Sequence, residues 1–120
     1  MPPTVQASPT DATTEPLAPA VRPAPGRYLA VEAGGDRRLV RLDDGTTHIG
    51  RSWAADIVLE DQAVSRRHAI VFATAESVRI LDDRSANGTR VNGRCVTGAD
   101  LADGDVIHVG RAVLIYREVA

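Results

Sequence analysis

Short apolar runs separated by turn-forming residues fill the chain from residue 27 to residue 120. Glycine and aspartate cluster between the runs, as in Asp43-Asp44-Gly45 and Asp103-Gly104-Asp105, and such clusters favour tight turns. No stretch shows the roughly 3.6-residue apolar period of an amphipathic helix. Many short strands at about 8–12-residue spacing are typical of a sandwich or barrel, so the pattern predicts an all-β fold. The runs that we interpret as strands lie at residues 28–32, 37–42, 46–49, 57–59, 69–73, 77–81, 106–109 and 112–116.

The core of this fold is predicted to be aliphatic, because aromatic residues make up only 3% of the chain. Trp53 is an exception within a polar loop, where it either packs beneath the loop or lines a binding surface. Cys95 is interpreted as a small, half-buried residue near a turn. The predicted core consists of Leu29, Val31, Leu42, Ile49, Ile57, Leu59, Ile70, Phe72, Val78, Ile80, Val106, Val109, Leu114 and Tyr116.

Residues 1–26 differ in composition from the rest of the chain. They hold all seven prolines and otherwise mostly Ala, Thr and Ser, with no aromatic residue. Such a segment buries too little apolar surface to offset the entropy of ordering it. We therefore predict a disordered Pro/Ala/Thr-rich tail (1–26) followed by one folded domain (27–120). The tail is either an inert linker or a carrier of kinase-accessible hydroxyls, among which Thr13 and Thr14 are the most suggestive.

Composition excludes several classes of function. A net charge of −2 is unlike the strongly basic surface of a nucleic-acid-binding domain. One cysteine and three scattered histidines form no internal disulfide and no metal site, and no cofactor is predicted. The chain has no lysine for a Gly-x-x-x-x-Gly-Lys loop and no Gly-x-Ser-x-Gly elbow, so no enzymatic activity is expected. No apolar run approaches the ~20 residues of a membrane span and no signal-peptide pattern is seen, which favours a cytoplasmic monomer without membrane partners.

Three polar segments interrupt the strand pattern: Gly50-Arg51, residues 65–68 and residues 85–93. A phosphorylated side chain carries nearly two negative charges and several acceptor oxygens. It is bound by guanidinium groups, small hydroxyl donors and free backbone N–H groups. Arg51, Ser65 and Arg66 supply the first two kinds of group, and the Gly/Asn-rich residues 85–93 let the backbone approach closely. The segments therefore predict an anion-binding cluster of loops.

Five segments along the domain carry a resemblance to a known family. They are Gly50-Arg51-Ser52, residues 56–59, residues 65–69, residues 85–93 and residues 101–107. In order and spacing they resemble a forkhead-associated (FHA) domain, as found in small bacterial signalling proteins, and the resemblance covers residues 27–118. It implies an eleven-stranded antiparallel β-sandwich of the SMAD/FHA type. It also implies that loops at one end bind a phosphothreonine-containing protein or peptide, a substrate or partner of a Ser/Thr protein kinase.

The resemblance assigns contact roles to four residues. Arg51 pairs with the phosphate, and Ser65 donates its hydroxyl to another phosphate oxygen. Arg66 stands where the family often has a further phosphate or backbone contact. Asn87 holds the peptide main chain beside the phosphothreonine through its side-chain amide.

The same resemblance assigns bracing roles. His68 is expected to hold loops together by hydrogen bonds from an uncharged ring rather than to touch the ligand. Gly50, Gly88 and Gly93 are expected to serve close approach and turn geometry, and Asn92 to brace a loop.

Ala86 departs from the family pattern, since the family frequently has Thr there. The missing hydroxyl removes about 0.5–1.5 kcal/mol of binding, the usual net worth of one hydrogen bond. This departure favours an alternative, an FHA-fold protein-interaction scaffold that binds partners independently of phosphorylation. A further expectation is self-regulation, in which phosphorylated Thr13 or Thr14 occupies the domain's own loops.

Overall fold

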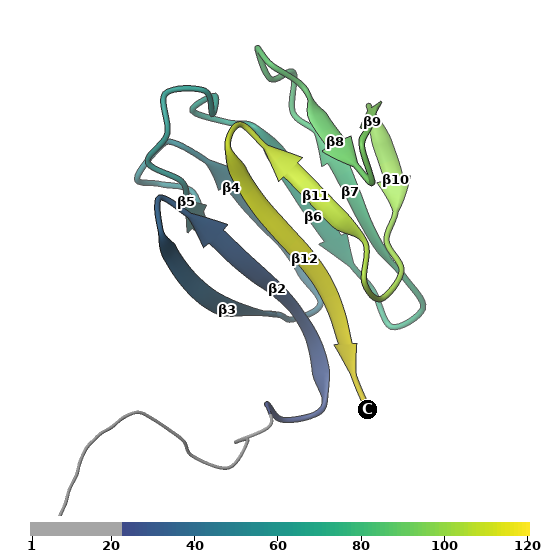
Figure 1. The fold of residues 1–120 in the computed structure, drawn as a ribbon. Helices are drawn as coiled ribbons and strands as arrows, with labels where there is room; N and C mark the ends of the chain where they lie inside the picture. The colour runs from purple at the N-terminus through teal and green to yellow at the C-terminus, as the bar shows by residue number, and fades with distance from the viewer. Residues whose placement is uncertain (1–22) are drawn as a thin grey trace, which may run out of the picture.

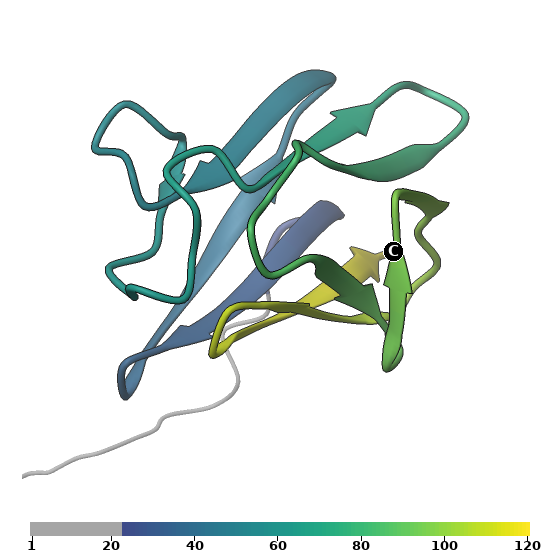
Figure 2. The same cartoon turned by 90° about the horizontal axis from the view of Figure 1, so that it is seen from above.

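Two β-sheets stacked face to face make up the structure (Figure 1), and the view from above separates the two layers (Figure 2). The computed structural model describes residues 23–120, and within this range it has eleven strands and no helix. The predicted all-β sandwich is confirmed. No helix of the described range is long and apolar enough to cross a membrane.

One sheet has five strands and the other has six. In spatial order, the five-stranded sheet contains β10 (Gly98–Asp100), β7 (Val78–Asp82), β6 (Ala69–Ala73), β4 (Gly45–Gly50) and β5 (Ile57–Val58). The six-stranded sheet contains β3 (Asp36–Leu42), β2 (Gly26–Ala33), β12 (Ala112–Val119), β11 (Val106–Val109), β8 (Thr89–Val91) and β9 (Arg94–Val96).

The expectation of a purely antiparallel sandwich is wrong at one place, because β4 and β5 pair in parallel. Consecutive parallel strands usually need a long crossover between them. Here only Ile57 and Val58 pair, opposite Ile49 and Gly50. The loop of residues 51–56 is therefore long enough to return the chain to the end of β4.

The core between the sheets is aliphatic around the buried Tyr116. The prediction is wrong for Ile70, Phe72 and Val106, whose side chains lie on the outer faces of the sheets. Strand β6 instead buries Ala69, Val71 and Ala73, and β11 buries Ile107 and Val109. Successive strand residues point to opposite faces, so a one-residue error in phase exchanges the buried and exposed sets.

One single-residue expectation is also wrong, because Cys95 is exposed rather than half-buried. Of the two alternatives for Trp53, packing beneath its loop is excluded, since the side chain is 86% exposed.

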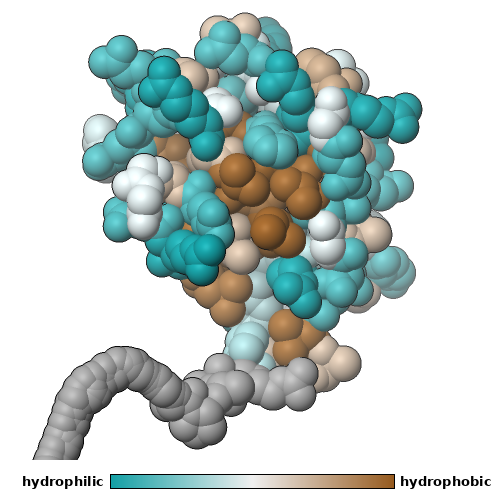
Figure 3. Space-filling model, in the orientation of Figure 1, coloured by the Kyte–Doolittle hydropathy of each residue, from teal (hydrophilic) through white to brown (hydrophobic). Residues whose placement is uncertain are grey.

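The outer face of the six-stranded sheet bears an apolar patch (Figure 3). Leu39, Ala30, Ile115 and Val106 lie in register across β3, β2, β12 and β11 on this face. Leu39 is the most exposed of the four.

The two ends of the sandwich differ in what they carry. Gly26 pairs with Val119, so the described N-terminal segment and the C-terminus leave together at the lower end in Figure 1. At the other end, a Cβ atom on Gly110 in the β11–β12 turn would lie 2.7 Å from Val64. The long loops that contain the predicted site residues therefore gather at the end opposite the chain termini.

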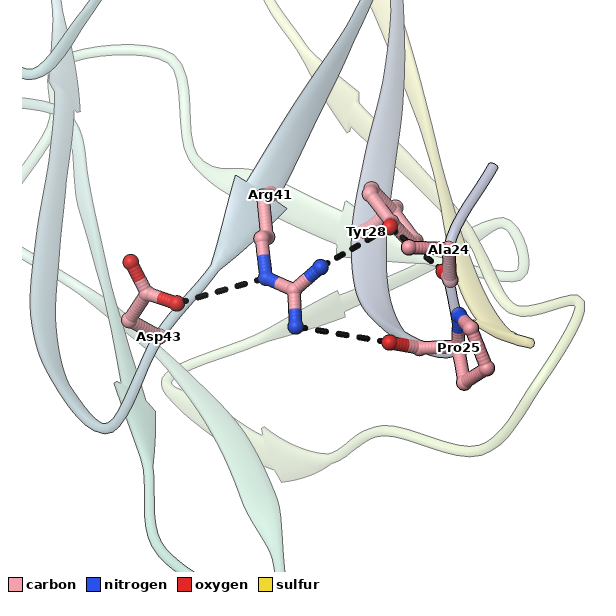
Figure 4. Close-up of polar contacts among 5 residues, drawn as sticks. All are labelled: Ala24, Pro25, Tyr28, Arg41 and Asp43. Carbon is pink, nitrogen blue, oxygen red and sulfur yellow. Dashed lines mark hydrogen bonds and ion pairs between the residues drawn. The ribbon is translucent and has the colours of Figure 1, made fainter. Parts of the chain in front are cut away.

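Residues 1–22 of the predicted tail lie outside the described residues, together with Thr13 and Thr14. The segment that follows contacts the domain (Figure 4). The Tyr28 hydroxyl donates to the Ala24 carbonyl at 2.6 Å, and Arg41 donates to Tyr28 Oη at 3.1 Å and to the Pro25 carbonyl at 3.3 Å. The Arg41 guanidinium also lies 3.4 Å from Asp43. These contacts fasten the chain just before β2 begins.

Truncation of a buried side chain between the sheets should destabilise the domain far more than truncation on an outer face. Leu114 is fully buried, whereas Leu39 is 50% exposed. We expect Leu114→Ala to lower the free energy of unfolding by about 2–5 kcal/mol and Leu39→Ala by less than about 0.5 kcal/mol. Urea titration followed by circular dichroism measures both. Equal losses would contradict the assignment of the core.

Candidate functional site

Three loops meet at the end of the sandwich away from the termini. They are residues 51–56 between β4 and β5, residues 59–68 between β5 and β6, and residues 83–88 between β7 and β8. The Arg51 N–H donates to the Ser65 carbonyl at 2.9 Å and the Ser52 N–H to the Arg66 carbonyl at 3.2 Å. These two bonds join the first loop to the second.

The second and third loops are joined by side chains. The Ala86 N–H donates to Ser65 Oγ at 2.8 Å. Asn87 Nδ2 donates to the Ala63 carbonyl, also at 2.8 Å. The structure therefore brings Arg51, Ser65, Ala86 and Asn87 into one cluster, as the sequence predicts.

Gly50 allows the first two loops to approach each other. A Cβ atom at this position would lie 2.1 Å from the Arg66 carbonyl oxygen and 2.8 Å from its carbon. Both are backbone atoms that cannot move aside without displacing the loop. Any larger residue at position 50 would therefore separate the loops that carry Arg51 and Ser65.

His68 is buried completely beneath the loops. Its Nδ1 accepts a hydrogen bond from the Ser65 N–H at 3.0 Å, and its Nε2 lies 2.8 Å from the Gly88 carbonyl oxygen. An acceptor at Nδ1 and a donor at Nε2 correspond to a neutral imidazole with its proton on Nε2. The ring thus joins the second loop to the third, and Gly88 adopts the left-handed φ of 85° that presents its carbonyl.

Asp82 organises the third loop, and sequence reasoning missed this role. Its Oδ1 accepts hydrogen bonds from Ser85 Oγ at 2.5 Å and Thr89 Oγ1 at 2.7 Å, and its Oδ2 accepts one from the Ser85 N–H. Ser85 Oγ in turn accepts the Gly88 N–H at 2.9 Å. An aspartate three residues before a serine is a local turn signal that could have identified this network.

The hydrogen bonds to Asp82 also set its acidity. Burial acts to raise the pKa of Asp82, but the hydrogen bonds from Ser85 and Thr89 outweigh burial, so the pKa lies below its ordinary value. The charged form is therefore the one that the folded loop stabilises.

The residues predicted to contact a ligand keep hydrogen-bonding capacity that the domain itself does not use. Arg51 Nε donates to the Val64 carbonyl at 3.0 Å, which orients the guanidinium and leaves its two terminal nitrogens. Ser65 Oγ accepts from Ala86, so its own hydroxyl hydrogen is not used in that bond. Asn87 uses its amide nitrogen, which leaves its carbonyl oxygen as an acceptor.

The three loops hold four arginines and four acidic residues and so carry no net charge, but three of these arginines form no ion pair among residues 23–120. These three, Arg51, Arg66 and Arg84, are exposed. Arg67 differs, because it pairs with Asp83 at 3.1 Å. The loops therefore present a group of arginines suited to an anion.

Asn92 and Gly93 are not part of the loop cluster. They form the β8–β9 turn at the far end of β8 from Gly88. Asn92 Nδ2 donates to Asp105 at 3.0 Å and Asn92 Oδ1 accepts the Val106 N–H at 2.9 Å. These bonds brace the β8–β9 turn against the segment that leads into β11.

Replacement of Asp82 by the isosteric amide should weaken the loop in a pH-dependent way. Because the folded-state pKa lies below the ordinary value of 3.8, the carboxylate stabilises the fold above that value, and its contribution is lost as the pH falls through the folded-state pKa. We expect Asp82→Asn to lower the free energy of unfolding by about 1–3 kcal/mol at pH 7.

Urea titrations from pH 7 to pH 3 measure this difference, with Asp100→Asn on the exposed β10 as the control. The gap between wild type and Asp82→Asn should narrow below pH ~4. A gap that stays constant over this range would mean that the carboxylate charge is not what stabilises the loop.

Comparisons with known proteins agree with this geometry. Residues 33–119 match the family model described as the cytoplasmic domain of the inner membrane component of the type III secretion system, which is related to FHA domains. The chain is 39% identical over 97 residues to the glycogen accumulation regulator GarA of Mycolicibacterium smegmatis, covering 78% of this chain but only 60% of that protein.

Two solved structures are similar over nearly all of their own length. One, from an analysis of phosphothreonine-dependent FHA domain interactions, has a TM-score of 0.74 and 36% identity, over 78% of this chain and 97% of that one. The other is the FHA domain of FhaA in complex with the intracellular domain of Rv3910, with a TM-score of 0.72 and 37% identity, over 77% and 100%. The predicted family is confirmed: this chain belongs to the forkhead-associated domain family.

Proposed function

We propose that this chain is a phosphothreonine-peptide-binding adaptor module in Ser/Thr kinase signalling. The observation that carries the proposal is the meeting of Arg51, Ser65 and Asn87 from three loops at one end of the sandwich. Each retains a donor or acceptor that its contacts within the domain do not use. The similarity to an FHA domain from an analysis of phosphothreonine-dependent interactions supports the same function.

Arg51 supplies the main attraction for the phosphate. Its Nε is fixed on the Val64 carbonyl, so the two terminal nitrogens form a fork of fixed direction. Hydrogen bonds between a guanidinium and a phosphate are charge-assisted and roughly twice as strong as neutral ones. Ser65 adds its hydroxyl hydrogen, and Arg66 adds a second exposed positive charge.

Asn87 holds the peptide rather than the phosphate. Its amide nitrogen is fixed on Ala63, so its carbonyl oxygen is positioned to accept a main-chain N–H of the bound peptide. Because these side chains are already oriented by contacts within the domain, binding requires little further ordering of the loops.

Ala86 weakens the site without removing its framework. The methyl group offers no hydroxyl to the phosphate, yet the backbone N–H of Ala86 still orients Ser65.

We expect the module to act as a cytoplasmic monomer on phosphorylated proteins, and not on nucleic acids or membranes. The alternative is a scaffold that binds its partners independently of phosphorylation. Equal binding of phosphorylated and unphosphorylated peptides would favour it.

The anchor role of Arg51 can be measured directly. In calorimetric titrations with a phosphothreonine peptide library and unphosphorylated copies, binding should require the phosphate. Arg51→Ala should weaken it by about 2–5 kcal/mol, because truncation leaves the phosphate charge without its partner. Arg117→Ala, on β12 near the end where the termini leave, is the matched control and should change binding by less than about 0.5 kcal/mol. Equal affinity for both peptide forms would favour the scaffold instead.

We further propose that phosphorylated Thr13 or Thr14 occupies these loops, within one molecule or between two. The described chain enters the sandwich at Gly26, at the end opposite the loops. Strand β2 has eight residues, which span ~26 Å. An extended chain from Pro23 back to Thr14 reaches ~30 Å. The tail is therefore barely long enough for its phosphothreonine to reach the loops of the same molecule, and binding to the loops of a second molecule competes with this.

Phosphorylation by a Ser/Thr kinase should therefore lower affinity for an outside phosphopeptide. Light scattering over a concentration series separates the two forms, because capture between molecules gives concentration-dependent dimers and capture within one molecule gives a monomer. The Thr13→Ala/Thr14→Ala double variant is the control and should retain full affinity. A phosphorylated protein with unchanged affinity and unshifted NMR signals of residues 83–88 would exclude self-capture.

A further inference from the structure

Trp53 is far more exposed than any other large apolar residue of the described range. Its exposed fraction is 86%, against 50% for Leu39 and 38% for Phe72. Tryptophan gains most from burial of its large ring, and large side chains of this kind are seldom left in solvent. At this exposure the ring adds almost nothing to the hydrophobic core, so its contribution lies outside the packing of the domain.

The loop that carries Trp53 is fixed by hydrogen bonds on both sides of it. The Ala54 N–H donates to Ser52 Oγ at 3.2 Å, and the Ala55 N–H donates to the Ser52 carbonyl at 3.0 Å. The base of the loop is closed by the His48 N–H, which donates to Asp56 at 2.8 Å. The ring is therefore displayed on an ordered turn, and a ligand that covers it need not first order the backbone.

The turn carries Trp53 close in sequence to the proposed phosphate anchor. Trp53 follows Arg51 by two residues, and the intervening Ser52 is hydrogen-bonded to the Arg66 backbone. Consecutive peptide residues lie about 3.8 Å apart. A peptide whose phosphate pairs with Arg51 therefore has residues within a few positions that can reach the indole.

The kind of side chain that fits the ring follows from the chemistry of the indole. The two charged residues of its loop, Arg51 and Asp56, are both exposed and of opposite sign, so this loop does not select a charged partner for the ring. An apolar side chain gains from covering the ring, because both groups then remove apolar surface from water. We propose that Trp53 binds an apolar side chain of the phosphopeptide, one that lies within a few residues of the phosphothreonine. This inference rests on the proposed phosphothreonine function.

The test uses phosphothreonine peptides in a Gly/Ser background, with a single leucine placed in turn at each of three positions on either side. Leucine at one or two of these positions should raise affinity for the wild-type protein about tenfold, the usual effect of one well-covered aromatic contact. Trp53→Ala should remove this gain and leave binding of the leucine-free phosphopeptide unchanged within twofold. Phe72→Ala, which removes an exposed aromatic side chain from the outer face of β6, is the matched control and should keep the gain.

Trp53 is the only tryptophan of the chain, so its fluorescence reports the same contact independently. Emission should shift to shorter wavelength with the preferred leucine peptide and not with the leucine-free one. If phosphopeptides bind through Arg51 but no leucine position is favoured and emission does not move, this inference is wrong while the proposed function stands. If binding ignores both the phosphate and Arg51→Ala, the proposed function itself fails.

Discussion

A buried, uncharged imidazole is the contact on which the loop cluster depends. His68 accepts from the backbone of Ser65 and donates to the backbone of Gly88, and its complete burial keeps solvent from replacing either partner. A buried donor or acceptor without a partner costs about 1–3 kcal/mol, so the two loops are strongly favoured in this single arrangement. The close backbone contact at Gly50 then places Arg51 relative to both.

At position 86 the side chain and the backbone have separate roles, because the backbone N–H orients Ser65 whichever side chain is present. The hydroxyl expected at this position is absent, but the backbone N–H of residue 86 still fixes the Ser65 hydroxyl. The Asp82 network maintains the turn in which that N–H is presented. The geometry of the cluster is therefore independent of the side chain at position 86.

The fold could be predicted because alternation and turn residues repeat along the chain, but the phase of some strands could not. In β6 the larger Ile70 and Phe72 face outwards, while Ala69 and Ala73 face the core. Residues opposite each other on neighbouring strands share a face, and here Ala69 lies opposite Ile49 and Ala73 opposite Val78. The core volume is thus supplied by the neighbouring strands, which the local sequence of β6 does not reveal.

The site was predictable to the extent that it follows sequence motifs. The gathering of Arg51, Ser65 and Asn87 in one cluster of loops was predictable because each lies in a segment of distinctive composition, whereas their individual contact roles stay predictions that rest on the family resemblance. Residues 85–93 also form one continuous motif, yet β8 carries Asn92 and Gly93 about 10 Å away from the loops, at ~3.3 Å per strand residue. The role of Asp82 depends on three hydrogen bonds formed only in the folded loop.

The pairing of Gly26 with Val119 bears on how such a domain is combined with other domains. The two ends of the sandwich strands lie side by side, and both leave from the side away from the loops. A domain with neighbouring ends can be placed between two segments of a longer polypeptide without stretching either of them. The loops would then stay exposed whatever is joined to the two ends. The same domain can therefore be inserted into different proteins without blocking its loops.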